Sequence, residues 1–419
     1  MERRRIVITG MGCISPVGNA VEAAWHSVRN GISGISEISL FDTSGLKVKV
    51  AGEVKDFDPA AFGIERKHLR RMARFSRFAV AAANQAVEDS GYDRESLQKE
   101  KCGIVLGSCM GGMEALSEGF ETLCSKDSDR IPPLTIPLML TNEAASNVSI
   151  FLGLQGFSWT MGTACSSGTD AIGLAADLIK AGRCNVCITG GTDAPLTKFS
   201  IASYDALLAL SRNFNGSPEK SSRPFDRDRD GFVMAEGSVI FILEELEHAK
   251  KRGAKIYAEV AGFGSSCDAY HITSPLKDGS GAAIAVKEAI QDAGINPEDL
   301  DYYNAHGTST EANDITETNM LKSVFGDYAY RLNISSTKSM TGHLIGASGA
   351  IEALFTVKAL QENFVPPTIN LENQDFEGGC DLNYTANKGV EKELNYAASV
   401  SLGFGGHNSC LILKKYSDL

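Results

Sequence analysis

The sequence predicts an α/β fold of layered sheets covered by helices. Along all 419 residues, short apolar segments rich in strand formers alternate with segments whose apolar residues recur at helical spacing. The pattern starts twice. The first strand is expected to end at Gly10-Met11-Gly12, and it is echoed by the strand 255–260, which is expected to end at Gly262-Phe263-Gly264. This echo is short and does not by itself establish a duplication. No low-complexity linker lies between the two parts, so we expect two halves, 1–254 and 255–419, that share one interface.

The composition is that of an ordinary globular protein. Hydrophobic residues make up 43% and charged residues 22% of the chain, which excludes the disordered and fibrous classes. No apolar run approaches the ~20 residues of a membrane span, and the run after the first five residues is too short for a signal peptide. We therefore expect a cytoplasmic protein without membrane insertion. The net charge of −12 argues against nucleic-acid binding.

Helices and strands of the first half can be placed in order. A helix is expected to begin near Asn19 and to end at Gly31. A dinucleotide-binding fingerprint is set aside, because its third glycine is replaced by Ser15. Further helices are expected at 65–91, 142–152 and 171–179, and further strands at 102–106, 157–161 and 239–243.

The expected helix 65–91 carries a basic stripe. The stripe consists of Arg66, Arg70, Arg74 and Arg77, with Lys67 and Arg71 beside it. Such a stripe is either a solvated face or a docking surface for an acidic partner.

Cys165 lies in T-A-C-S-S-G, between a strand and a helix. The unpaired N–H groups and the positive dipole end of a helix N-terminus favour a thiolate, so Cys165 is a candidate nucleophile. The alternative is a buried core cysteine. The other nine cysteines are scattered without a disulfide framework, and Cys184-x-x-Cys187 falls in an apolar segment, which favours core cysteines over a zinc or redox site.

Three glycine-flanked clusters in the second half supply partners for such a nucleophile. N-A-H-G-T-S-T places His306 directly after the strand 301–304. S-T-K-S-M-T-G-H-L-I-G brings Lys338 and His343 into one loop after the strand 332–335. The third cluster, S-L-G-F-G-G-H-N, has enough glycine for close approach of the backbone to a ligand. Each histidine alone could be structural, but the joint pattern favours a shared site at the ends of the strands.

Together these motifs resemble the elongating β-ketoacyl-acyl-carrier-protein synthases, most closely the synthase II branch of bacterial fatty-acid synthesis. The match runs from the first strand to the last and includes R-P-F-D at 223–226 and D-A-Y-H at 268–271. The resemblance implies a thiolase-like fold, with two pseudo-repeated halves in a layered α-β-α-β-α arrangement, and a homodimer. It also implies acyl carrier protein as the partner, loaded with acyl or malonyl groups. The phosphopantetheine belongs to that partner, and no cofactor or metal of the chain itself is expected.

The resemblance also implies roles for single residues. Cys165 resembles the acyl-accepting nucleophile, and His306 and His343 resemble the two active-site histidines. Lys338 resembles the lysine that organises the second histidine loop, and Glu317 the acid that pairs with this lysine.

Substrate-binding positions follow in the same way. Phe404 resembles the gating phenylalanine, whose backbone N–H forms an oxyanion hole with that of Cys165. Thr308 and Thr310 resemble the threonines that hold the phosphopantetheine arm, while Met110 and Phe232 fall at substrate-binding positions. The expected carrier-protein dock consists of Lys67, Arg70, Arg71, Arg74 and Arg212.

These residue types suit a decarboxylative Claisen condensation. A thiolate attacks a thioester, and the acyl group then rests on Cys165. Loss of CO2 from malonyl-carrier protein leaves an enolate, to which His306 and His343 can donate as neutral imidazoles. Because decarboxylation generates the carbanion, no strong base is needed.

Two other readings share part of this pattern. A ketosynthase of a type II polyketide or aryl-polyene pathway would have the same catalytic motifs, whereas a non-catalytic partner subunit is disfavoured by the presence of Cys165. Glu311 and Asn313 replace the Pro and Gly that most relatives carry, which predicts a slightly different turn. Met110 is expected to cap the acyl pocket and to limit chain length.

Overall fold

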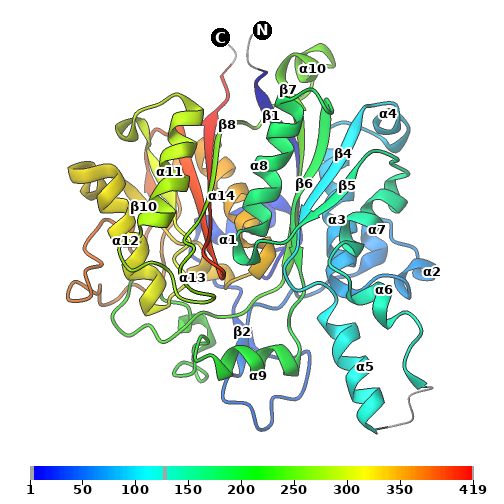
Figure 1. Cartoon of the computed structure of the whole chain (residues 1–419), viewed down its shortest axis with the longest axis horizontal. Coiled ribbons are helices and arrows are strands. Elements are labelled where there is room, and N and C mark those ends of the chain that lie inside the picture. Colours follow the sequence, from blue (N-terminus) through cyan, green and yellow to red (C-terminus); the bar gives the residue numbers. More distant parts are fainter. Residues whose placement is uncertain (1–3, 126–129, 418–419) are drawn as a thin grey trace.

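A ten-stranded sheet forms the frame of the protein (Figure 1). The structure, a computed structural model, describes residues 4–125 and 130–417. From one edge to the other the strands are β10 (Asn333–Ser335), β9 (Tyr302–Asn304), β13 (Tyr396–Gly403), β14 (His407–Lys415), β8 (Ala258–Cys267), β1 (Ile6–Ile14), β7 (Gly237–Glu245), β6 (Val186–Asp193), β4 (Cys102–Gly107) and β5 (Ser158–Met161). Small pairs are β2 (Ser36–Glu37) with β3 (Val50–Ala51), and β11 (Phe364–Val365) with β12 (Val390–Glu391).

The sheet has two halves with the same order of strand directions. β1 and β8 meet at the centre through only two residue pairs, Val7 with Glu259 and Ile8 with Ala258. Moving outward, each half continues with two antiparallel pairings, β1–β7–β6 and β8–β14–β13. Two parallel pairings then complete each half, β6–β4–β5 and β13–β9–β10. This correspondence confirms the two pseudo-repeated halves.

The repeated glycines lie within β1 and β8. We expected the strands to end at these glycines, and that expectation is wrong, because β1 continues to Ile14 and β8 to Cys267. A Cβ atom on Gly12 would lie 2.0 Å from the carbonyl oxygen of Ala82 in helix α3 (Arg74–Asp89). A Cβ atom on Gly264 would lie 2.1 Å from the carbonyl oxygen of Ala285 in α11 (Ser280–Ala293). Glycine is therefore required for the same close helix packing in both halves.

The helices form three layers around the two half-sheets. α3 and α7 (Glu143–Leu152) cover the outer face of the first half, and α11 and α12 (Glu311–Phe325) cover that of the second. α8 (Ser167–Lys180) and α14 (Ser348–Glu362) pack against each other between the halves (Figure 1). The other helices are α1 (Val21–Arg29), α2 (Arg66–Leu69), α4 (Arg94–Gln98), α5 (Met113–Ser125), α6 (Thr135–Met139), α9 (Lys198–Ala206), α10 (Leu246–Lys251) and α13 (Lys338–Thr341). The α-β-α-β-α layering is confirmed.

The expected helix 65–91 is two helices, α2 and α3, separated by residues 70–73. The Arg77 side chain donates to the carbonyl oxygens of Met72 and Leu69, at 2.9 and 3.0 Å, and so holds the break together. Arg74 forms an ion pair with buried Glu236. The continuous basic stripe is therefore wrong, because these two arginines are directed into the fold.

No helix in the described ranges has the length and hydropathy that crossing a bilayer requires.

Candidate active site

Cys165 lies in a strained turn between β5 and α8. The short 3-10 helix that carries it, Ala164–Ser166, begins at Ala164 with a φ of 52°. The matching turn before α14 begins at Ile345 with a φ of 54°. Non-glycine residues seldom adopt positive φ, and such strain persists only where the surroundings enforce it. Gly168 and Gly346 allow the two turns to pack closely against each other. A Cβ atom on Gly168 would lie 2.9 Å from the carbonyl oxygen of Gly346.

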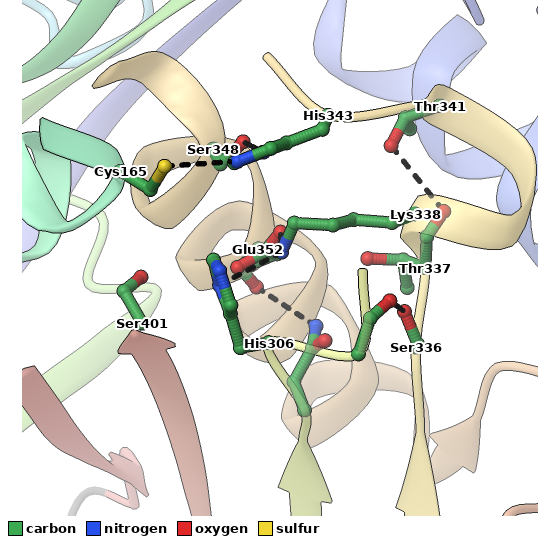
Figure 2. Close-up of polar contacts among 12 residues, drawn as sticks. Cys165, His306, Ser336, Thr337, Lys338, Thr341, His343, Ser348, Glu352 and Ser401 are labelled. Atoms are coloured by element: carbon green, nitrogen blue, oxygen red, sulfur yellow. Dashed lines mark hydrogen bonds and ion pairs between the residues drawn. The ribbon is translucent and has the colours of Figure 1, made fainter. Parts of the chain in front are cut away.

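His343 contacts the nucleophile directly. Its Nε2 atom lies 3.0 Å from the Sγ atom of Cys165, and its Nδ1 atom lies 2.7 Å from the hydroxyl oxygen of Ser348 (Figure 2). The backbone N–H of His343 donates to the carbonyl oxygen of Val233 at 2.7 Å. The ring is thus held at both nitrogens and at the backbone.

His306 faces the same sulfur from the second half of the sheet. Its ring centroid lies 5.4 Å from that of His343, with an interplanar angle of 87°. The Nζ atom of Lys338 lies 3.3 Å from Nδ1 of His306 (Figure 2). An ammonium group has no acceptor, so Nδ1 must accept and the imidazole proton must reside on Nε2. The arrangement therefore presents Nε2–H of His306 as a donor.

The acid that pairs with Lys338 is Glu352 of α14, so the expected pairing with Glu317 is wrong. Lys338 and Glu352 form an ion pair in which both side chains are buried. Burial raises the pKa of Glu352 to about 7, and the Lys338 charge opposes this rise. A charged residue inside the otherwise apolar stretch 350–355 was the sequence signal for Glu352.

Glu317 instead holds the His306 turn. Its carboxylate accepts the backbone N–H groups of His306 and Gly307, each at 2.8 Å. The hydroxyl of Tyr303 donates to the same carboxylate at 3.0 Å. Glu317 is therefore a positioning residue for His306 in this structure.

The site is uncharged at Cys165 and at both histidines. Burial raises the pKa of the Cys165 thiol to about 11, although the Lys338 charge and the backbone N–H of Phe404 oppose this rise. Burial, together with the Lys338 charge, holds the pKa values of His306 and His343 well below the usual range. The expectation of a thiolate at the helix end is wrong, because the loss of hydration at the buried sulfur outweighs the favourable contacts.

A cavity of about 820 Å³ opens from these groups. Its lining includes seven of the predicted site residues: Cys165, His306, His343, Thr308, Thr310, Phe232 and Phe404. The hydroxyls of Thr308 and Thr310 lie 2.9 Å apart. Met110 lies behind this lining, and its thioether sulfur accepts the hydroxyl of Tyr204 at 3.7 Å.

Two further residues of the site were missed. Tyr204 lines the cavity and stacks on Phe404, with ring centroids 6.4 Å apart. Buried Asp193, at the end of β6, accepts the backbone N–H groups of Met110 at 3.0 Å and of Gly346 at 2.8 Å. Asp193 thereby ties the loop of Met110 to the turn before α14. The sequence T-G-G-T-D at the end of a strand was the available signal for Asp193.

Cys165, His306 and His343 are also a possible ligand set for a transition metal. Their ligand atoms lie within 4.8 Å of one another, and thiolate and imidazole are the ligands that zinc prefers. The buried ammonium group of Lys338, 3.3 Å from His306, opposes a cation at this position.

The predicted carrier-protein dock is only partly a surface cluster. Arg70 and Arg71 are exposed, as is Lys67, which pairs with Glu65 at 2.8 Å. Arg74 and Arg212 do not fit the prediction of free surface charges. Arg74 pairs with Glu236, and Arg212 with Asp205, each at 2.6 Å, and both arginine side chains are half-buried. Figure 1 places α2 well apart from α12, which contributes to the cavity mouth.

Comparison with known proteins gives a consistent picture. Residues 3–249 match "Beta-ketoacyl synthase, N-terminal domain", and residues 257–372 match "Beta-ketoacyl synthase, C-terminal domain". The chain is 47% identical over 416 residues to "3-oxoacyl-[acyl-carrier-protein] synthase 2" of Synechocystis sp., with 99% of both chains covered. It is 45% identical over 418 residues to the protein of the same name from Coxiella burnetii, with 100% of both covered.

A solved structure of a type II PKS acyl-carrier protein in complex with its ketosynthase is also similar. Its matched chain superposes with a TM-score of 0.89 at 34% identity, covering 99% of this chain and 100% of that chain.

Proposed function

Because this chain belongs to the β-ketoacyl synthase family, we propose that it condenses an acyl group held on Cys165 with malonyl-acyl-carrier-protein, giving 3-oxoacyl-acyl-carrier-protein and CO2 in fatty-acid elongation. One observation carries the proposal: Cys165 Sγ lies 3.0 Å from Nε2 of a neutral His343, beside a neutral His306. A thiol beside two uncharged imidazoles can be acylated. The resulting thioester then lies next to two imidazole N–H groups that can donate to an enolate oxygen. The full-length relatives named 3-oxoacyl-[acyl-carrier-protein] synthase 2 support the fatty-acid pathway.

In the first half-reaction, an acyl thioester transfers its acyl group to Cys165. The thiol proton moves to Nε2 of His343 as the sulfur attacks the thioester carbonyl. The backbone N–H of Phe404, which already points at Cys165 Sγ, is placed to donate to the developing oxyanion. Nε2 then returns the proton to the departing carrier thiolate. The products are acyl-Cys165 and the free thiol of the carrier.

In the second half-reaction, malonyl-carrier protein loses CO2. The electron pair of the broken C–C bond forms an enolate, whose oxygen accepts a hydrogen bond from Nε2–H of His306. It accepts a second from Nε2–H of His343 once that proton has shifted from Nδ1 to Nε2, so that Nδ1 accepts from the Ser348 hydroxyl. The enolate carbon attacks acyl-Cys165, and the C–S bond breaks to release a Cys165 thiolate. This thiolate takes up one proton from the solvent, so the condensation consumes one proton. Low histidine pKa values suit this role, because the imidazoles stay neutral donors.

The carrier partner and the quaternary structure extend this proposal. A carrier protein would bring the phosphopantetheine arm to Thr308 and Thr310, which line the cavity. The chemistry above requires no cofactor of the chain itself.

A homodimer would cover β5, the edge strand of the sheet, where Trp159 is 42% exposed and Ile150 of the adjacent α7 is 73% exposed. Sedimentation of the wild type and of Trp159→Glu tests this interface. A monomeric wild type would contradict it.

The condensation is tested by mass spectrometry of the intact protein. Incubation with acyl-carrier thioester should add one acyl group at Cys165, and Cys165→Ala should remain unmodified. Acylation of another cysteine would overturn the assignment. A competition between reduced and poly-β-keto acyl chains separates fatty-acid elongation, in which chains reduced at C3 are preferred, from the polyketide alternative, in which chains with a keto group at every second carbon are preferred.

A further inference from the structure

Tyr204 lies between the nucleophile and the loop that carries Met110. Tyr204 lies in the C-terminal half of α9 and lines the same cavity as Cys165. Its ring centroid lies 5.7 Å from that of Phe232, and the Phe232 ring lies 5.2 Å from the His343 ring. An acyl chain that starts at Cys165 and runs toward Met110 therefore passes the Tyr204 side chain.

The Tyr204 hydroxyl is a donor with a weak partner. In the described part of the chain, its recorded acceptor is the thioether sulfur of Met110 at 3.7 Å. Thioether sulfur is a poor acceptor compared with oxygen. Burial, with the nearby Cys165, Cys109 and Asp193, raises the pKa of Tyr204, so the phenol keeps its proton.

The side chains that pack around Tyr204 include an apolar cluster. Phe232, Ile201 and Ile345 belong to one buried cluster, against which Met110 and Tyr204 pack. A phenylalanine would fill this wall without leaving a polar group in it. The presence of a hydroxyl that is barely satisfied by the protein points to an acceptor that arrives with the substrate.

We propose that Tyr204 is a specificity-determining residue that donates a hydrogen bond to an oxygen atom on the acyl chain. The substrate class is then an otherwise reduced acyl group that carries one hydroxyl or ether oxygen along the chain. The oxygen replaces the Met110 sulfur as the acceptor, and the flexible thioether moves aside. This inference rests on the condensation proposed above, since it concerns the chain held on Cys165.

The test uses ten-carbon acyl-carrier thioesters in which one ether oxygen replaces a methylene at successive positions. An ether oxygen accepts but cannot donate, and it changes the chain volume little. The kcat/KM of Cys165 acylation is measured for each chain relative to the all-carbon chain, in the wild type and in Tyr204→Phe. The wild type should prefer one oxygen position, and Tyr204→Phe should lower that relative kcat/KM about fivefold, the size of one neutral hydrogen bond.

Met110→Leu is the matched control. It removes the sulfur acceptor and keeps the hydroxyl donor, so the preference for the oxygen position should be retained or increased. Equal relative rates in the wild type and in Tyr204→Phe at every position would overturn the proposal, as would loss of the preference in Met110→Leu. Failure of the all-carbon chain to acylate the wild type would instead overturn the condensation itself. The all-carbon rate of each variant also reports whether its site is folded.

Discussion

Nε2 of His343 lies 3.0 Å from Sγ of Cys165, and burial keeps both groups uncharged. The nucleophile is therefore a thiol beside a base, rather than a preformed thiolate. Its proton has to leave during the attack, and His343 is the group in contact that can take it. This relationship makes acylation dependent on His343 and on the electrostatics of the buried pocket.

Replacement of His343 by Ala should slow both half-reactions. Acylation of Cys165 should fall by about a hundredfold or more, because a positioned general base contributes roughly 10²–10⁴-fold. Malonyl decarboxylation should also fall, because one enolate donor is lost. Single-turnover acylation and CO2 release measure the two effects. His26→Ala, which changes an exposed histidine, should leave both rates unchanged. An unaltered acylation rate in His343→Ala would contradict the base role.

Alkylation of Cys165 should depend steeply on pH. With a thiol pKa of about 11, the thiolate fraction rises about tenfold per pH unit from neutral pH upward. The rate of iodoacetamide labelling at Cys165, followed by peptide mass spectrometry, should therefore keep rising through about pH 9. Lys338→Met removes the charge that lowers this pKa and should slow labelling at every pH in that range. A plateau below pH 8 in the wild type would indicate a stable thiolate–imidazolium pair instead.

Met110→Gly should lengthen the acyl chains that the enzyme accepts. Met110 lies behind the cavity lining, so its removal opens space beyond Tyr204. The ratio of kcat/KM for long chains to that for medium chains should rise about tenfold, since each methylene newly accommodated contributes roughly 1 kcal/mol. A competition among saturated acyl-carrier thioesters measures the ratio. An unchanged chain-length profile would show that Met110 does not cap the pocket.

Reversal of charge at Arg70 and Arg71 should weaken only reactions with carrier-bound substrates. Both side chains are exposed, and the expected partner is acidic. The KM for carrier thioesters should rise about tenfold in Arg70→Glu/Arg71→Glu, while that for free pantetheine thioesters should stay constant. Lys287→Glu, an exposed site on α11, serves as the matched control. An equal rise for both substrate types would rule out this docking surface.

Arg74 should behave as a structural residue. Its ion pair with Glu236 is 2.6 Å long, and Glu236 is fully buried. Arg74→Met leaves that carboxylate without its cation and should lower the free energy of unfolding by about 3 kcal/mol. Arg70→Met should change it by less than about 0.5 kcal/mol. Urea unfolding compares the two variants. Equal free energies of unfolding in the two variants would show that the Arg74 ion pair does not stabilise the fold.

Several features could be predicted because they depend on residues close together in the chain. The strand-to-helix position of Cys165 follows from local periodicity, and the structure confirms it. His306 and His343 both follow strands, and the structure brings them to one cavity with Cys165. The alternation of strands and helices likewise predicted the layered α/β fold, because the spacing of apolar residues within each segment indicates whether it forms a helix or a strand.

Other features were decided by segments that meet only in the folded chain. Lys338 pairs with Glu352 rather than Glu317, because α14 carries Glu352 beneath the lysine while Glu317 is occupied by the backbone N–H groups of the His306 turn. Arg74 is directed into the fold rather than to the surface because it pairs with Glu236, a carboxylate that lies 162 residues later.

The charge state of the site was likewise decided by tertiary structure. By itself, the sequence determined which groups are present and which local turns hold them, and from the helix N-terminus we expected a thiolate. The packed fold decided how far water is excluded from Cys165, and that exclusion raises the thiol pKa to about 11 despite the helix end. Hydration is a property of the surroundings in three dimensions, so no local pattern of residues could have specified it.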